Sequence, residues 1–237
     1  MYLEEFAKNL KFKWKGSLFS VEAAQAVHKR AKEYLHRLEK AGVVERVCWG
    51  WYYFPYEFRD VWEFLRKDEG FKILIRQTAS CIWNYDFIHR NVYRLAVKDR
   101  SYKRALEAFA KKRGWIFEIE VISGLENKIK FKKIDGLLVE DLESCIVNCM
   151  AEWSFLDAIS ALYFRRDEAS LRELKQLGRW KRISKTEIRI WNAIKYACNT
   201  FNENLGRKIF NVRNTRVSRP DIRELIDESV EKVVEFA

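Results

Sequence analysis

Residues 17–55 decide the first part of the fold and read SLFSVEAAQAVHKRAKEYLHRLEKAGVVERVCWGWYYFP. Within them, Ser20 can cap a short helix over residues 20–26, because its hydroxyl can accept from a free N–H of the first turn. A second helix is predicted over residues 28–41, since apolar side chains recur there at spacings of three and four. These side chains are Ala31, Tyr34, Leu35 and Leu38. Gly42 ends this helix in the left-handed conformation that glycine adopts at little cost.

Two short strands are predicted next, over residues 43–48 and 51–54, with Trp49-Gly50 as the turn between them. Two helices followed by such a hairpin are typical of a winged helix-turn-helix, in which the hairpin is the wing. We expect Trp51 and Tyr53 to share one face of the hairpin, whereas Trp49 lies in the turn and can approach nucleic acid.

Charge points to a polyanionic partner. The net charge is +11 and the isoelectric point is near 9.4, so attraction to phosphates is strong at low salt. The second helix has a basic face, as entry into the major groove requires. In the leader, lysines alternate with Phe12 and Trp14. This pattern either presents the lysines on one side or makes them an ordinary solvated face. The candidate DNA contacts are Lys29, Arg30, Lys32, His36, Arg37, Arg46, Trp49, Lys13 and Lys15.

A second basic surface is expected over residues 205–219, through Arg207, Arg213 and Arg216.

Composition indicates a globular chain of one or two domains, with 237 residues of which 48% are apolar. No signal peptide and no apolar run of about 18 residues is seen, so we expect a soluble cytoplasmic protein without membrane contact. Five scattered cysteines argue against a disulfide framework, and Cys145 and Cys149 are expected to be buried rather than metal ligands. Charged residues reach 33%, which favours a thermophilic, archaeal source.

The remaining chain predicts an α+β fold, with a winged helix-turn-helix over residues 1–56 and a mixed-sheet and helical C-terminal domain over residues 57–237. Strands are expected over residues 72–79, 91–99, 115–122 and 128–135, the last two joined as a hairpin through residues 123–127. A helix capped by Ser101 and stopped by Gly114 lies between the second and third strands. Further helices are expected over residues 57–67, 139–153, 154–164, 167–177, 185–205 and 220–234.

Catalytic motifs are sparse. The chain lacks the glycine-rich phosphate-binding patterns and has three histidines, so we expect no enzyme activity, no cofactor and no metal. The alternative is a metal-dependent nuclease of basic α+β fold, in which Glu118, Glu120 and Asp135 would hold Mg²⁺. Glu126-Asn127-Lys128 spells the E-x-K of restriction-type nucleases, but it falls in a predicted turn.

A family resemblance rests on Phe19-Ser20, Ala23-Ala24, the run Tyr34-Leu35-His36-Arg37-Leu38-Glu39-Lys40-Ala41-Gly42, Glu45-Arg46-Val47 and Gly50-Trp51-Tyr52. These residues resemble the winged-helix domain of AbiEi-type antitoxins, which are transcriptional regulators paired with a nucleotidyltransferase-like toxin. Residues 138–149 and 155–158 also resemble the entry of that family into its helical region. Residues 26–30 depart from it, because they replace a glycine-containing turn between the helices.

The resemblance implies autoregulatory DNA binding through Lys29, Arg30, Lys32 and Arg37, with a C-terminal domain that neutralises a toxin. We therefore expect a DNA-binding transcriptional regulator that acts as the antitoxin-like component of a defence or toxin-antitoxin operon. Its expected partners are double-stranded DNA and a protein toxin, and a homodimer is left open. Recognition of structured RNA by the basic and aromatic surface is a further alternative.

Overall fold

The computed structural model describes residues 2–67, 73–84, 90–124 and 129–236. The chain forms two compact units, one from residues 1–75 and 90–139 and the other from residues 76–89 and 140–237. These limits differ from the predicted domain boundary between residues 56 and 57, which stays a prediction. An α+β fold is confirmed, because the helices accompany one antiparallel and one mixed sheet.

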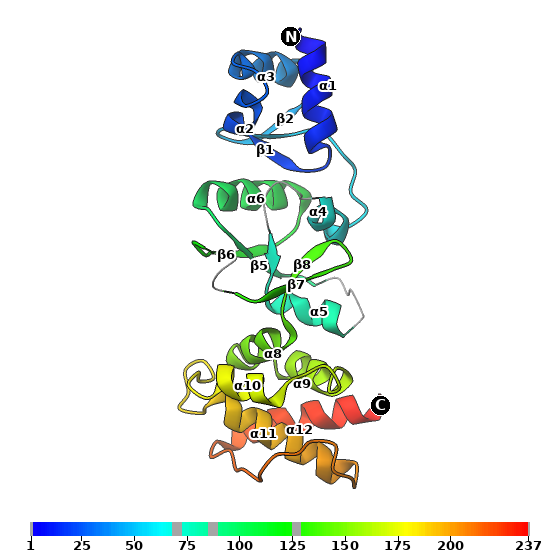
Figure 1. The fold of residues 1–237 in the computed structure, drawn as a ribbon, viewed down its shortest axis with the longest axis vertical. Helices are drawn as coiled ribbons and strands as arrows, with labels where there is room; N and C mark the ends of the chain where they lie inside the picture. Colours follow the sequence, from blue (N-terminus) through cyan, green and yellow to red (C-terminus); the bar gives the residue numbers. More distant parts are fainter. Residues whose placement is uncertain (1, 68–72, 85–89, 125–128, 237) are drawn as a thin grey trace. The chain divides into compact units, whose positions relative to one another are not determined.

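The first unit begins with a small helical and antiparallel layer (Figure 1). Its elements are α1 (Leu3–Trp14), β1 (Leu18–Ser20), α2 (Val21–Gln25), α3 (Ala31–Lys40), β2 (Glu45–Cys48) and β3 (Trp51–Tyr53). The strand order is β1-β3-β2. A core that includes Phe6, Leu10, Phe19, Leu35 and Tyr52 joins the helices to the sheet.

Local signals in this layer are confirmed. The Ser20 hydroxyl caps α2 by accepting a hydrogen bond from the Ala23 N–H at 3.1 Å. The apolar residues predicted for α3 are all buried, and Gly42 has φ +70°. The start of α3 is three residues later than predicted, at Ala31. Before it, His28 Nδ1 accepts from the Arg30 N–H at 3.2 Å, and the His28 ring stacks on Tyr34, so this segment turns outside the helix.

The leader is a helix, so the expectation that alternating lysines share one side is wrong. Residues of a helix meet at spacings of three and four rather than two. In α1 the side chains at spacing four, Phe6, Leu10 and Trp14, are buried. Lys13 and Lys15 are exposed at the end of this helix.

A five-stranded mixed sheet follows in the first unit, with α6 packed against it. The elements are α4 (Val61–Lys67), β4 (Leu74–Ile75), β5 (Tyr93–Val97), α6 (Arg100–Arg113), β6 (Phe117–Val121), β7 (Phe131–Ile134) and β8 (Leu137–Glu140). The strand order is β6-β5-β4-β8-β7. Strand β4 pairs antiparallel with β5 and parallel with β8, so the predicted mixed sheet is confirmed.

Three local predictions for this sheet are wrong. β6 and β7 lie at opposite edges of the sheet and therefore cannot form the expected hairpin. Residues 125–127 of the predicted connection lie outside the described residues. Strand β8 occupies the beginning of a predicted helix, because Leu138 and Val139 pair with β4. Helix α6 is capped by Asp99 rather than Ser101, since the Asp99 carboxylate accepts from the Tyr102 N–H at 2.7 Å. Its predicted stop at Gly114 is confirmed, with φ +72°.

Strand β3 is buried on both faces. Tyr52 points into the N-terminal core, where it stacks with Phe19. On the opposite face, the Trp51 Nε1–H donates to the Ser101 hydroxyl at 2.8 Å, and Tyr53 meets Phe109 edge to face at 5.1 Å. The hairpin therefore forms part of the contact between the N-terminal layer and α6.

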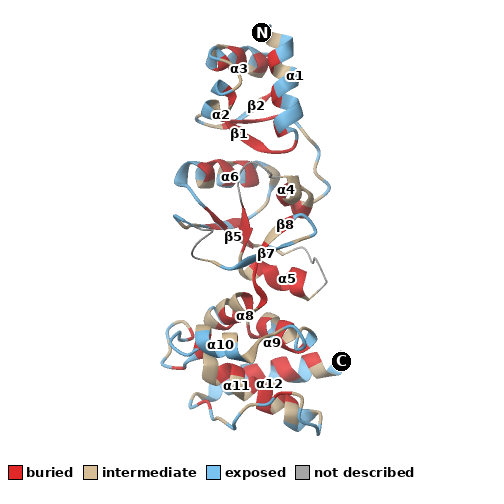
Figure 2. Ribbon diagram, in the orientation of Figure 1, coloured by how far each residue is buried: buried red, intermediate tan, exposed pale blue. Residues whose placement is uncertain are grey.

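The second unit is helical. It contains a short 3₁₀ turn (Gln77–Ala79), α5 (Ser80–Trp83), α8 (Leu142–Ala151), α9 (Phe155–Phe164), α10 (Leu171–Gly178), α11 (Ile190–Asn204) and α12 (Pro220–Glu235). Figure 2 shows that the inward faces of α8, α9, α11 and α12 are buried. The strand predicted over residues 72–79 is reduced to β4, because the 3₁₀ turn and α5 follow at once. Over the described ranges, every helix is too short or too polar to cross a membrane.

Candidate nucleic-acid interface

An exposed basic stripe runs along α3. Lys32, His36 and Lys40 follow one another at a spacing of four, so their side chains share one face of the helix. Lys29 lies in the turn just before the helix. All four are exposed, and none of them forms an ion pair with another described residue. We call these four residues the α3 stripe. Lys40 was missed by sequence reasoning, although its four-residue spacing from His36 is the signal that would have found it.

Two other predicted contacts on α3 have a carboxylate partner. The Glu33 carboxylate accepts from Arg30 Nη2 at 2.6 Å and pairs with Arg37 Nη2 at 2.9 Å. The hydrogen bond from Arg30 lowers the pKa of Glu33, which is therefore ionised at neutral pH. Part of the charge of Arg30 and Arg37 is thus compensated within the helix. The uncompensated positive charge lies on the α3 stripe.

The turn of the β2–β3 hairpin presents one large aromatic ring. Trp49 is 92% exposed, whereas Trp51 is 5% exposed. Gly50 has φ +77°, a left-handed conformation that residues with a side chain rarely adopt, so glycine suits this tight turn. The structure thus places Trp49 at the tip, as expected.

Arg46, also predicted as a contact, is held on the hairpin surface. Its guanidinium pairs with Glu39 at 2.9 Å and donates to the Tyr52 hydroxyl at 3.0 Å. These bonds connect β2 to the end of α3 and to the neighbouring strand β3. Arg46 can orient the hairpin, but its charge is already shared with Glu39.

Lys13 and Lys15 are not brought into the α3 stripe. Phe6 of α1 packs edge to face on Tyr34, so α1 lies against the buried side of α3. Lys13 Nζ lies 4.6 Å from the Trp14 ring centroid, and Lys15 Nζ lies 5.9 Å from that of Tyr56. Both are cations over aromatic rings at the end of α1, on a different surface.

The three acids of the nuclease alternative are not brought together. Glu118 and Glu120 are exposed on one face of β6, and Glu118 pairs with Arg94 at 2.8 Å. Asp135 follows β7 and pairs with Arg66 at 2.7 Å. Because β6 and β7 are the two edges of a five-stranded sheet, four strand spacings separate them, which is roughly 19 Å. The E-x-K at residues 126–128 lies outside the described residues.

A different acidic group, Asp141, Glu143 and Glu173, lies in the second unit with its ligand atoms within 4.8 Å of one another. Each of the first two side chains has a structural partner. Asp141 caps α8 by accepting from the Ser144 N–H at 2.8 Å, and Glu143 accepts from the Ser170 N–H at 2.7 Å. Asp141 therefore stabilises the start of α8, and Glu143 links α8 to the start of α10.

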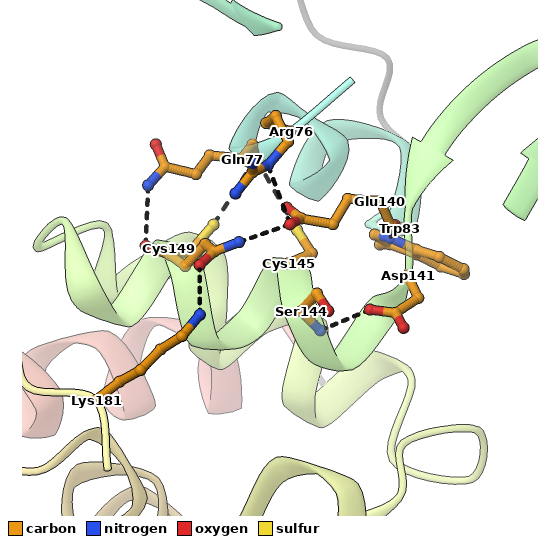
Figure 3. Close-up of polar contacts among 10 residues, drawn as sticks. Arg76, Gln77, Trp83, Glu140, Asp141, Ser144, Cys145, Cys149 and Lys181 are labelled. Atoms are coloured by element: carbon orange, nitrogen blue, oxygen red, sulfur yellow. Dashed lines mark hydrogen bonds and ion pairs between the residues drawn. The ribbon is translucent and has the colours of Figure 1, made fainter. Parts of the chain in front are cut away.

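A buried polar cluster surrounds Glu140 at the start of α8 (Figure 3). Its carboxylate lies 3.1 Å from Arg76 Nε and accepts from the Asn148 amide at 2.6 Å. Lys181 donates to the same amide at 3.3 Å, and the Trp83 indole donates to the Glu140 carbonyl at 3.1 Å. Only 1% of Glu140 is exposed. Burial raises the pKa of this carboxyl from 4.5 to about 7, although Arg76 opposes the shift.

The cysteines beside this cluster are structural. Cys145 and Cys149 are one turn apart on α8, and both are buried, as the sequence predicted. Their sulfurs lie 4.0 and 3.7 Å from the Gln77 carbonyl oxygen. The hydrogen bond with Cys149, together with burial, raises the pKa of the Cys145 thiol, which disfavours a reactive thiolate.

We predict that Glu140 makes stability depend on pH. The pKa of Glu140 is higher in the folded than in the unfolded state, so the protonated carboxyl favours folding. This stabilisation is fully present below about pH 4.5 and is lost as the pH rises through about 7. Glu140→Gln mimics the protonated form, so its advantage in unfolding free energy over the native chain should grow as the pH rises from 5 and reach roughly 3 kcal/mol by pH 8. Urea unfolding across this range measures the difference. The exposed Glu152→Gln is the control, and parallel curves for Glu140→Gln and the native chain would contradict the prediction.

Comparisons with known proteins do not assign the chain to a family. No protein-family model matches the chain, and no curated protein matches it. Among solved structures, the crystal structure of the RV2827C protein from Mycobacterium tuberculosis is similar at a TM-score of 0.48 and 10% sequence identity. The alignment covers 96% of this chain and 79% of that one.

Proposed function

We propose that this protein is a DNA-binding transcriptional regulator whose N-terminal elements act as a winged helix-turn-helix. The observation that carries the proposal is the α3 stripe. Its three lysines and one histidine are exposed along α3 and the turn before it, without a compensating carboxylate among the described residues. A helix of this kind can enter the major groove with its cations toward the phosphates and base edges. The exposed Trp49 supports a role of the hairpin as the wing.

The biological setting that we propose is that of an antitoxin-like component of a defence or toxin-antitoxin operon. Its support is the resemblance of residues 17–55 to AbiEi-type antitoxins. In this setting the regulator binds its own operator and a protein toxin, and has no catalytic activity of its own. Expression of the neighbouring reading frame with and without this chain tests the setting. Growth arrest that this chain relieves is the expected result, and a neighbour without toxicity would contradict it.

The DNA-binding proposal predicts that the full chain retards duplex DNA and that affinity falls steeply with salt. Each phosphate neutralised by the α3 stripe adds about 0.9 to the slope of log affinity against log salt. Fluorescence anisotropy with a labelled duplex at several salt concentrations measures this slope. A slope near zero would contradict the proposal, as would displacement of the duplex by an equal amount of structured RNA.

The same preparation separates a regulator from the nuclease alternative. Supercoiled plasmid incubated with the protein and Mg²⁺ or Mn²⁺ should remain intact, because the geometry keeps Asp135 away from Glu118 and Glu120. Nicking that depends on the divalent ion and disappears in Asp135→Asn would overturn the regulator assignment in favour of the nuclease.

A further inference from the structure

The second unit contains a cavity of about 690 Å³ between α10, α11 and the chain that follows α11. Four cationic side chains line it, namely Arg172, Lys175, Lys195 and Arg213, together with Trp191. Its volume is that of a site for one small molecule. Among the residues that the structure describes, none that lines the cavity is acidic.

The positive charge of this cavity is uncompensated. Arg172, Lys175 and Arg213 form no ion pair with any residue that the structure describes, and Lys195 donates only to the neutral Thr215 hydroxyl, at 3.2 Å. Elsewhere in the same unit, arginines do have carboxylate partners, as in the pairs Arg165–Glu168 and Arg182–Glu187, each at 2.6 Å. Four like charges around one cavity raise one another's electrostatic energy, and a bound anion would relieve this repulsion.

The irregular wall that carries Arg213 is anchored. The Asn202 amide oxygen accepts from the Ile209 and Phe210 N–H groups at 2.8 and 2.9 Å, and its amide nitrogen donates to the Phe210 carbonyl at 2.8 Å. Phe210, which precedes Arg213 in the chain, is 4% exposed, and Val217, which follows it, is also buried. The segment is thus fastened before and after the cationic residue, so that Arg213 is held at the cavity.

Trp191 offers an aromatic surface in the same cavity. It is half-buried, and its ring makes no stacking or cation contact with another described residue. Its backbone is fixed by close packing, because a Cβ placed on Gly178 would come within 3.1 Å of the Trp191 nitrogen. The indole is therefore available for stacking from a fixed position at the start of α11.

We propose that this cavity binds a nucleotide that carries two or more phosphates, with the base on Trp191 and the phosphates among Arg172, Lys175, Lys195 and Arg213. Cations recognise phosphate oxygens through charge-assisted hydrogen bonds, and an indole stacks on any base. The limited volume favours a single nucleotide over a nucleic-acid strand. This site lies in the second unit and does not depend on DNA binding by α3.

Titration of the full chain with ATP and GTP, followed by calorimetry, tests the site. We expect saturable binding with one site per chain, weaker binding of the monophosphates and none of the nucleosides. Lys175→Ala and Arg213→Ala should each weaken binding by about tenfold, the loss of one charge-assisted contact. Trp191→Ala should weaken it similarly, and Trp191→Phe should weaken it less because an aromatic face remains.

The matched control is Arg207→Ala, which removes an exposed cation from the same segment but outside the cavity. It should bind nucleotide as the native chain does, and melting temperatures of all variants check that the fold is retained. Equal weakening by Arg207→Ala and Arg213→Ala would overturn the proposal, because it would indicate general attraction to anions. Binding of inorganic pyrophosphate as tightly as ATP would exclude the role of Trp191. No nucleotide binding, with oligonucleotide binding lost in Lys175→Ala, would overturn it in favour of a strand.

Discussion

Replacement of Lys29, Lys32 and Lys40 together by alanine should weaken binding to duplex DNA by at least about a hundredfold, since each contact to phosphate or base contributes on the order of 1 kcal/mol or more. The physical reason is that these lysines carry the uncompensated charge of the α3 stripe. The slope of log affinity against log salt should fall by about three if all of them contact phosphates. Anisotropy titrations at several salt concentrations give both quantities.

The matched control for this experiment removes the same charge elsewhere. Lys111, Lys133 and Lys232 are exposed lysines from α6, β7 and α12, and their triple alanine variant has the same net charge as the α3 variant. It should retain most of the affinity. Full affinity in the α3 variant, or equal losses in both variants, would show that α3 is not the recognition helix.

Trp51→Ala should lower the free energy of unfolding by about 3 to 5 kcal/mol, as expected for loss of a large buried ring. The Trp51 ring packs on Tyr102, with centroids 5.3 Å apart, and its N–H donates to Ser101. Trp49→Ala should leave stability within about 0.5 kcal/mol of the native value, because its ring is exposed. The measurement is urea unfolding followed by far-ultraviolet circular dichroism.

Variants of these two tryptophans also distinguish effects on stability from effects on DNA affinity. If the hairpin is a wing, Trp49→Ala should reduce affinity for DNA while the fold is retained. Trp49→Phe, which keeps an aromatic ring, should recover part of that affinity. Equal loss of stability in Trp49→Ala and Trp51→Ala would contradict the assignment of Trp49 to the exposed tip.

The sequence predicted the parts of the fold that local physics determines. Ser20 as a cap, Gly42 and Gly114 as helix stops, and the apolar face of α3 depend on neighbours within a few residues. Strand β8 could not be recognised, because its pairing with β4 joins segments more than sixty residues apart. For the same reason, the hairpin expected between β6 and β7 is absent, and the predicted acids are separated.

The candidate sites, too, could be predicted from the sequence only where they depend on local spacing. The basic face of α3 was predicted from helical spacing. The ion pairs of Glu33 with Arg30 and Arg37 could not be predicted in this way, because they depend on side-chain geometry. The cavity of the second unit combines α10, α11 and an irregular segment. Its members Arg172, Trp191 and Arg213 are spread over some forty residues of sequence, and no periodic pattern connects them.

Because β3 is buried on both faces, the N-terminal elements cannot be moved to another protein without further changes. Trp51 and Tyr53 pack against Tyr102 and Phe109 of α6, so their large rings are covered by a segment that comes some fifty residues later in the chain. Removal of that segment would expose to water the faces of both rings that now pack on α6. Transplantation of the N-terminal elements to another protein would therefore require either α6 as well or polar replacements on the outer face of β3.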